Sequence, residues 1–284
     1  MSIKRDIANL LIVQDLIILS HATGLTHELQ FHRKLNQCFY FSFNLEEFIN
    51  TIQLLQRYGI TNISADILIG LPEQTKDELC KTVDLLFDLG LKHVSAYGLK
   101  VERGTPLRRM ILQGTIKLPN EDEAVDLYDF TQEKLKSCGF NRYEVSNFAN
   151  KGFECLHNVN CWNTQEYLGL GLGSHSYMFG RRFSNIKTLS KYCDKIGMST
   201  FPISQSMRIS FNEQIKERVM LGLRMEDGIN IDRLEGDFGI SFFEYFKKSK
   251  KLINMGYCAC VNNTYSICKD KFYVMNYILG ELLD

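Results

Sequence analysis

The 284-residue chain has neither a net charge nor a long apolar run. Lysine plus arginine and aspartate plus glutamate number 33 each, so no overall field draws the chain toward nucleic acid or an anionic membrane. No apolar stretch approaches the roughly 20 residues that a membrane-spanning helix needs. Gln14 and Asp15 interrupt the apolar segment near the N-terminus, which argues against a secretion signal. We therefore expect no nucleic-acid partner and no membrane span.

The dense cysteine spacing of a disulfide-rich domain is missing as well. The nine cysteines are an odd number and are scattered along the chain, which favours a reducing, cytoplasmic location over a disulfide-stapled secreted domain. Cys155, His157 and Cys161 raise the question of zinc, but structural zinc sites usually pair cysteines at closer spacing than this. Cys258 and Cys260 alternate in an apparent β-strand and are predicted to be small buried hydrophobic residues. No metal site is predicted.

The glycines at 169, 171 and 173 do not form a known phosphate-binding pattern. A dinucleotide fingerprint needs a third glycine at the position of Ser174, and no Gly-Lys-Ser/Thr follows. Glycine in a strand usually lets another backbone or a flat ligand approach closely. We interpret the segment as a site of close approach, to protein or to ligand.

From residue 44 the sequence alternates between helix and strand, which indicates an α/β fold with a parallel sheet and crossover helices. Capping-box pairs mark the helix starts at Thr75 and Asn120. The expected elements are a helix at 45–58, a strand ending near 69, a helix ending at Gly90, a strand at 93–99, a helix starting near Asn120 and a strand at 141–149.

After about residue 208 the pattern changes to three helices (212–224, 231–239 and 241–256), two β-runs (257–261 and 264–268) and a final helix. This predicts a small winged-helix-like domain. Its lysines are balanced by acids, so it lacks the basic face that binds nucleic acid. We divide the chain into an atypical segment 1–43, where local signals conflict, a barrel-related region 44–206 and a C-terminal domain 207–284.

Asp66 stands inside the apolar strand that ends near residue 69. A buried carboxylate is costly unless it is paired or hydrogen-bonded. It therefore either meets a basic neighbour or binds a ligand at the carboxyl end of the sheet, where α/β proteins place their sites.

Several motifs together resemble a known family. DILIGLPEQT (66–75), HVSAYGLKVERGTPL (93–107), RYEVSNFANKG (142–152), HNVNCW (157–162) and YLGLGLGSHSY (167–177) occur in this order. Their order and spacing resemble the oxygen-independent coproporphyrinogen III oxidase-like radical S-adenosylmethionine (SAM) proteins, and most of all the haem chaperone HemW branch. The resemblance covers about 45–284.

The resemblance implies an open (β/α)₆ barrel with a [4Fe–4S] cluster on three cysteines, next to bound S-adenosyl-L-methionine. In the oxidase branch the 5′-deoxyadenosyl radical abstracts hydrogen from a propionate side chain of the porphyrin precursor. In the HemW branch the protein is thought to bind haem and deliver it to a haem-accepting protein. Haem or a related porphyrin is therefore the expected partner.

The resemblance also implies roles for individual residues. Asp66 matches the strand acid that contacts SAM, and Gly173, Ser174 and His175 match the segment that lines the same pocket. His157 matches the histidine of the HN-x-x-Y-W motif and is a candidate haem ligand. The tyrosine of that motif is replaced by Cys161.

The cluster motif of the family, C-x₃-C-x₂-C, is absent, and Cys38 is the sole cysteine before residue 80. Residues 1–99 also hold room for only about three strand–helix repeats, since each βαβ unit takes about 30 residues. We expect an N-terminally truncated or frame-disrupted member with an incomplete barrel and no radical chemistry. A homodimer would cover the exposed sheet edge. The alternative is a non-enzymatic haem- or porphyrin-binding module.

Overall fold

The computed structural model describes residues 45–284, which belong to two compact units that meet in sequence at Cys155 and Leu156. The predicted atypical segment 1–43, including Cys38, lies outside the described residues. The predicted boundary between 206 and 207 falls inside the second unit, and the three domains drawn from the sequence stay a prediction.

The first unit is built on a four-stranded sheet with the order β1-β2-β4-β3. Its strands are β1 (Ser64–Ile69), β2 (His93–Gly98), β3 (Asn141–Arg142) and β4 (Asn147–Ala149). The predicted parallel pairing is confirmed for β1 and β2, whereas β4 and β3 extend the sheet with antiparallel pairs. The single strand predicted at 141–149 is wrong. The Tyr143 N–H donates to Asn147 O at 3.1 Å, which closes a turn and folds this stretch back on itself.

The first unit has four described helices, α2 (Leu45–Arg57), α3 (Lys76–Asp88), α4 (Pro106–Leu112) and α5 (Glu121–Ser137). Both predicted capping boxes are present, Thr75 with Glu78 on α3 and Asn120 with Glu123 on α5. In each, the cap side chain accepts a bond from the third helical N–H, and that residue's carboxylate accepts one from the cap N–H.

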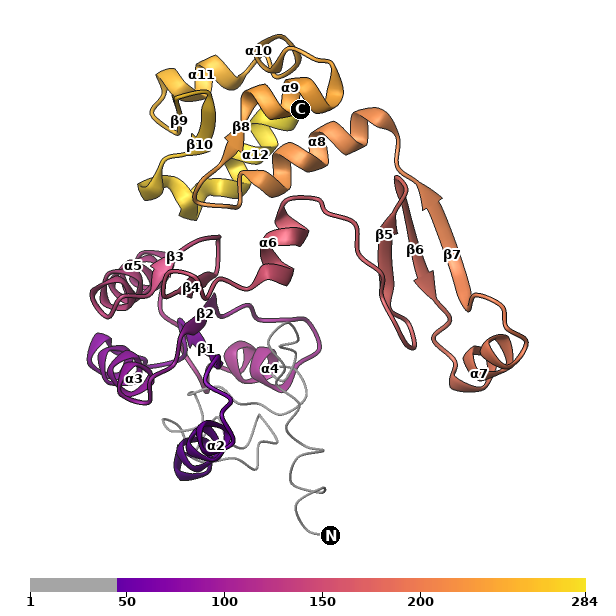
Figure 1. Ribbon diagram of the computed structural model, residues 1–284. Helices are drawn as coiled ribbons and strands as arrows, with labels where there is room; N and C mark the ends of the chain where they lie inside the picture. The colour runs from indigo at the N-terminus through magenta and orange to yellow at the C-terminus, as the bar shows by residue number, and fades with distance from the viewer. Residues whose placement is uncertain (1–44) are drawn as a thin grey trace. The chain divides into compact units, whose positions relative to one another are not determined.

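The two faces of this sheet differ because side chains alternate along each strand. One face is apolar and packs against α2, α3 and α5 (Figure 1), in a core that includes Ile67, Val94, Leu86, Leu135 and Phe148. The alternate residues of these strands, which lie on the other face of the sheet, are mostly polar and form the candidate site. The α/β class predicted from the sequence is confirmed by this alternation and by the parallel pair.

The second unit begins with a short helix, α6 (Leu156–Trp162), which the sequence did not predict. An antiparallel sheet of β5 (His175–Met178), β6 (Arg181–Asn185) and β7 (Ile203–Arg208) follows, with α7 (Leu189–Gly197) between its last two strands. The glycine-rich segment leads directly into β5.

The rest of the second unit contains the predicted three-helix region with a small sheet. Its elements are α8 (Phe211–Gly222), β8 (Ile229–Asn230), α9 (Ile231–Phe238), α10 (Phe242–Tyr245), α11 (Ser249–Asn254), β9 (Cys258–Val261), β10 (Thr264–Ile267), a 3₁₀ turn (Lys269–Val274) and α12 (Met275–Leu283). The strands pair as β8-β10-β9, and Asn262 and Asn263 form the β9–β10 turn with positive φ, which asparagine tolerates well.

Two local predictions in this region are wrong. The helix predicted at 241–256 divides into α10 and α11, because Phe246 leaves the helical conformation and is itself buried. Cys258 is buried as predicted, and burial raises its pKa to about 11. Cys260 is exposed instead, since it lies nearer the β9–β10 turn, where the sheet ends.

Between residues 45 and 284, the structure contains no helix that is both long and apolar enough to cross a membrane.

Candidate functional site

A row of polar side chains crosses the first unit's sheet. Asp66 on β1 is the register partner of Ser95 on β2, and Ser95 is the partner of Asn147 on β4. The three residues retain only 8%, 5% and 5% of their exposure. Among the described residues, the buried Asn147 Oδ1 has no hydrogen-bond partner. We call Asp66, Ser95 and Asn147 the polar row.

Two further groups lie at the edge of the polar row. Burial raises the pKa of Tyr97, and the nearby charges of Asp66 and Glu144 raise it further. Glu144 is fully buried, and one of its oxygens accepts the Ser146 N–H at 3.1 Å. The Asp66 carboxylate and the Asn147 amide oxygen make this face rich in acceptors, which suits a ligand that carries hydroxyl and ammonium donors.

Asp66 is the residue of this group that the sequence analysis found. The other members were missed, although a signal was present in HVSAYG, where polar residues stand at positions 93, 95 and 97. Polar side chains at every second position of a buried strand indicate one polar face.

His93 joins three parts of the first unit on the same face as the polar row. Its Nδ1 lies 2.7 Å from Ser64 Oγ on β1, and its Nε2 lies 2.9 Å from the Tyr143 hydroxyl. The Tyr143 hydroxyl also accepts the Cys155 N–H at 3.3 Å. Burial lowers the pKa of His93 from 6.5 to about 4, so its ring is neutral at pH 7.

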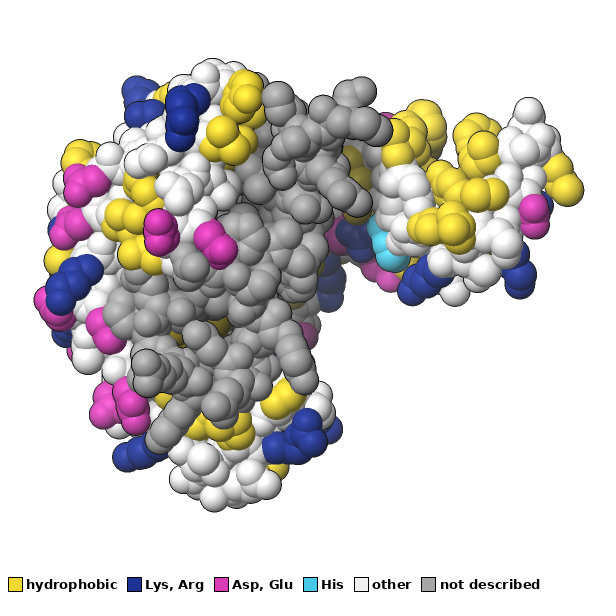
Figure 2. Space-filling view, turned by 90° about the horizontal axis from the view of Figure 1, so that it is seen from below, with side chains coloured by type: hydrophobic (Ala, Val, Ile, Leu, Met, Phe, Trp, Pro, Cys, Tyr) yellow, Lys and Arg dark blue, Asp and Glu magenta, His cyan; other side chains and the backbone are white. Residues whose placement is uncertain are grey.

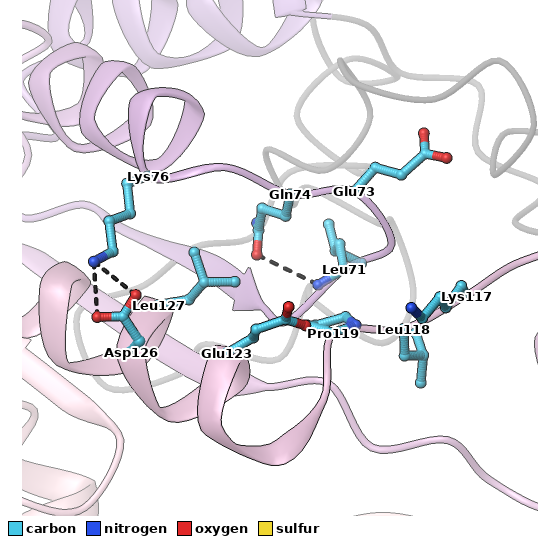
Figure 3. A pocket seen from close by; sticks show the side chains of 10 residues that line it. All are labelled: Leu71, Glu73, Gln74, Lys76, Lys117, Leu118, Pro119, Glu123, Asp126 and Leu127. Carbon is cyan, nitrogen blue, oxygen red and sulfur yellow. Dashed lines mark hydrogen bonds and ion pairs between the residues drawn. The ribbon is translucent and has the colours of Figure 1, made fainter.

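A cavity of about 490 Å³ opens beyond the carboxyl end of β1 (Figure 3), between the loop before α3 and the loop before α5. Gln74 closes the end of the strand, since its Oε1 accepts from Gly70 N at 2.8 Å and its Nε2 donates to Leu68 O at 2.9 Å. Lys76 and Asp126 point toward each other and form an ion pair of 2.7 Å. None of the predicted site residues lines this cavity.

The glycine-rich segment packs against β5. A Cβ atom on Gly169 would lie 2.2 Å from the carbonyl oxygen of His175, so the close approach here is to the chain's own backbone. Gly173 has a φ of +63°, which disfavours other residues. The Ser174 hydroxyl donates to Gly171 O at 2.9 Å and accepts from Asn185 Nδ2 at 2.9 Å. Ser174 therefore fixes the loop, while His175 is exposed.

The leucines of the same segment point outward. Leu168, Leu170 and Leu172 alternate with the glycines and are 59%, 82% and 45% exposed. Figure 2 shows further hydrophobic side chains on the part of the second unit that carries β5–β7 and α7, and Phe201 and Met198 are among the exposed residues there. Apolar surface of this extent is typical of a binding region.

Helix α6 carries His157 and Cys161 four residues apart, on one side of the helix. His157 is exposed, and its Nε2 lies 3.7 Å from Cys161 Sγ. Arg218 on α8 holds the end of α6, donating to Asn163 O and, at 3.0 Å, to Thr164 Oγ1. The Trp162 ring faces the Arg224 guanidinium at 5.9 Å.

The predicted site residues thus fall in different places. Asp66 belongs to the first unit, and Gly173, Ser174, His175 and His157 belong to the second. Gly173, Ser174 and His175 form one segment, whereas His157 lies on α6. In the described part of the chain, no three histidine, cysteine or acidic side chains gather in a way that would hold a metal ion.

Comparisons with known proteins agree on one family. Residues 209–264 match the HemN C-terminal domain. The chain is 32% identical over 196 residues to Heme chaperone HemW of Bacillus subtilis, which covers 69% of this chain and 52% of that protein. It is 34% identical over 206 residues to Heme chaperone HemW of Lactococcus lactis, which covers 72% of this chain and 54% of that protein. These matches support assignment of the chain to the HemW/HemN-like radical SAM family.

The HemW/HemN-like fold is supported by a solved structure. Coproporphyrinogen III oxidase (HemN) from Escherichia coli matches with a TM-score of 0.69 at 16% identity, over 89% of this chain and 62% of that one. The chain spans about half the length of the curated HemW relatives it matches.

We predict that His93 makes the first unit less stable in acid. The folded pKa lies below the unfolded value, so between pH 6.5 and about 4 only the unfolded state takes up this proton. Stability from this group is complete above pH 6.5 and falls by about 3 kcal/mol as the pH drops to 4. Denaturant unfolding at several pH values should show a shallower decline for His93→Gln. An equal decline in both proteins would contradict the prediction.

We also predict that Gly169→Ala destabilises the second unit by about 1–3 kcal/mol, because the added methyl group meets the His175 carbonyl. Thermal or denaturant unfolding measures the change. Gly236→Ala in α9 is the matched control: its Cβ meets nothing within 4 Å, and alanine favours the helix. The prediction fails if both variants are as stable as the parent.

Proposed function

We propose that the chain binds haem and passes it to a haem-accepting protein, as the name of its HemW relatives describes. The observation that carries this proposal is His157, an exposed imidazole on α6, in the segment HNVNCW that resembles the family's HN-x-x-Y-W motif. Imidazole is a common axial ligand of haem iron. Because His157 lies at the surface of a helix that Arg218 anchors, its ring can reach a ligand without unfolding the unit.

The exposed leucines support the same proposal. A porphyrin is a flat, largely apolar macrocycle, and its binding needs apolar surface as well as an iron ligand. Leu168, Leu170 and Leu172 offer such surface on the glycine-rich segment. The scattered cysteines favour a reducing compartment, and we propose the cytoplasm as the place of haem transfer.

The described residues do not fit a [4Fe–4S] cluster. Such a cluster needs cysteine thiolates close together, and no suitable group of donors exists among residues 45–284. The C-x₃-C-x₂-C motif is also absent from the 284 residues. We propose that this chain by itself performs no radical chemistry.

The polar row is the proposed contact for S-adenosyl-L-methionine. Its acceptor groups suit the ribose hydroxyls and the ammonium group of that molecule, and the unpartnered Asn147 Oδ1 provides one further acceptor. In the family's chemistry SAM supplies a 5′-deoxyadenosyl group. Asp66, with Ser95 and Asn147, would bind and orient it.

The haem proposal predicts a Soret shift when dithionite-reduced haem is titrated anaerobically into the purified chain. His157→Ala should weaken ferrous-haem binding about ten-fold or more, because it removes the axial nitrogen. Asn160→Ala is the control, since this exposed residue lies on the same helix and its amide does not ligate haem iron. No Soret shift with the parent protein would contradict the proposed function.

The proposal on radical chemistry predicts no stoichiometric iron or acid-labile sulfide after anaerobic purification. Equilibrium dialysis with SAM should show retention that falls about ten-fold in Asp66→Asn, a loss of roughly 1.4 kcal/mol. One [4Fe–4S] cluster per chain would refute the expected absence of iron and acid-labile sulfide. Equal retention of SAM by the parent and Asp66→Asn would refute the proposed contact between Asp66 and SAM.

A further inference from the structure

Helix α6 presents two side chains on one side, an imidazole and a thiol, of types that can ligate iron. His157 and Cys161 are one helical turn apart, and the Nε2–Sγ distance is 3.7 Å. The HN-x-x-Y-W motif has tyrosine where this chain has Cys161. The substitution places a thiol, a strong ligand for iron, beside the imidazole that we propose as the haem ligand.

The short distance between His157 Nε2 and Cys161 Sγ decides whether the two side chains can ligate opposite faces of one haem. Metal–thiolate and metal–imidazole bonds are about 2.3 Å and about 2.0 Å long. Ligands on opposite faces of one haem would therefore lie about 4.3 Å apart with the macrocycle between them. Two side chains from one turn of a helix cannot reach around a macrocycle. His157 and Cys161 thus address the same face, and one axial position can take only one of them at a time.

We propose that Cys161 is the axial ligand of ferric haem and that His157 replaces it when the iron is reduced. This inference rests on the proposed haem binding. An anionic thiolate stabilises the higher charge of Fe(III), whereas a neutral imidazole suits Fe(II). The oxidation state of the iron then decides which side chain holds the haem.

Reduction of the iron exchanges its protein ligand. A one-electron donor, dithionite in the experiment below, reduces Fe(III) to Fe(II). The iron–sulfur bond breaks, the thiolate takes a proton from water, and the Nε2 lone pair of His157 forms the new iron–nitrogen bond. Arg218 holds the end of α6, and both donors stay on this helix during the exchange.

The test uses the full chain with one equivalent of ferric haem, followed by absorption and electron paramagnetic resonance before and after dithionite. Cys161→Ser should lose the thiolate signature of the ferric form and bind ferric haem on the order of ten-fold more weakly. Cys161→Tyr, which restores the motif, should also lose the thiolate signature. Cys193→Ser changes an exposed cysteine on α7 and should leave both forms unaltered.

After reduction, Cys161→Ser should match the parent, and His157→Ala should lack the imidazole signature. Identical ferric spectra for the parent and Cys161→Ser would overturn the inference while ferrous-haem binding through His157 still stood. Loss of the thiolate signature in Cys193→Ser would also overturn it. If the parent shows no haem spectrum in either oxidation state, the proposed function itself fails. Circular dichroism confirms that each variant is folded.

Discussion

The parallel pairing of β1 and β2 is the constraint on which the first unit depends. With Asp66 opposite Ser95, every odd-numbered residue of β1 faces the helices, and every even-numbered one faces the other side. A shift of β1 by one residue against β2 would turn Ile67 out of the core and bring Asp66 into it. The burial of Ile67, Val94 and Phe148 against α2, α3 and α5 therefore also fixes where the polar row lies.

This constraint links stability to the site. The polar groups on the second face are nearly as buried as the apolar ones on the first, so they need partners or a ligand. His93 meets that need through Ser64 and Tyr143, which tie β2 to β1 and to the turn before β4. Asn147 retains a buried acceptor in the described structure, and such a group is where a ligand's donor gains most.

In the second unit, some residues of the glycine-rich segment 168–174 hold the loop in shape, and others offer surface to a ligand. Gly169 and Ser174 serve the loop itself, through the close approach to His175 and the bonds to Gly171 and Asn185. The leucines between the glycines face outward, where a flat apolar ligand can meet them. His157 and Cys161 lie on a separate helix, so iron ligation and apolar contact are carried by different elements.

The sequence by itself determined the capping boxes at Thr75 and Asn120, the parallel strand pair and the presence of an acid within β1, because these depend on local hydrogen bonds and on period-two alternation. It also carried the motifs that resemble the HemW/HemN-like family.

Only the tertiary structure decided that residues 141–149 fold back as two strands and that His93, Ser95 and Asn147 share a face with Asp66. The structure also decided that residues 156–162 form helix α6, although their sequence gives no strong helix signal. This helix brings the His157 Nε2 within 3.7 Å of the Cys161 Sγ. The register between strands, the antiparallel partners of β2 and β3 and the contacts across the sheet depend on residues far apart in the chain, so local sequence patterns do not determine them.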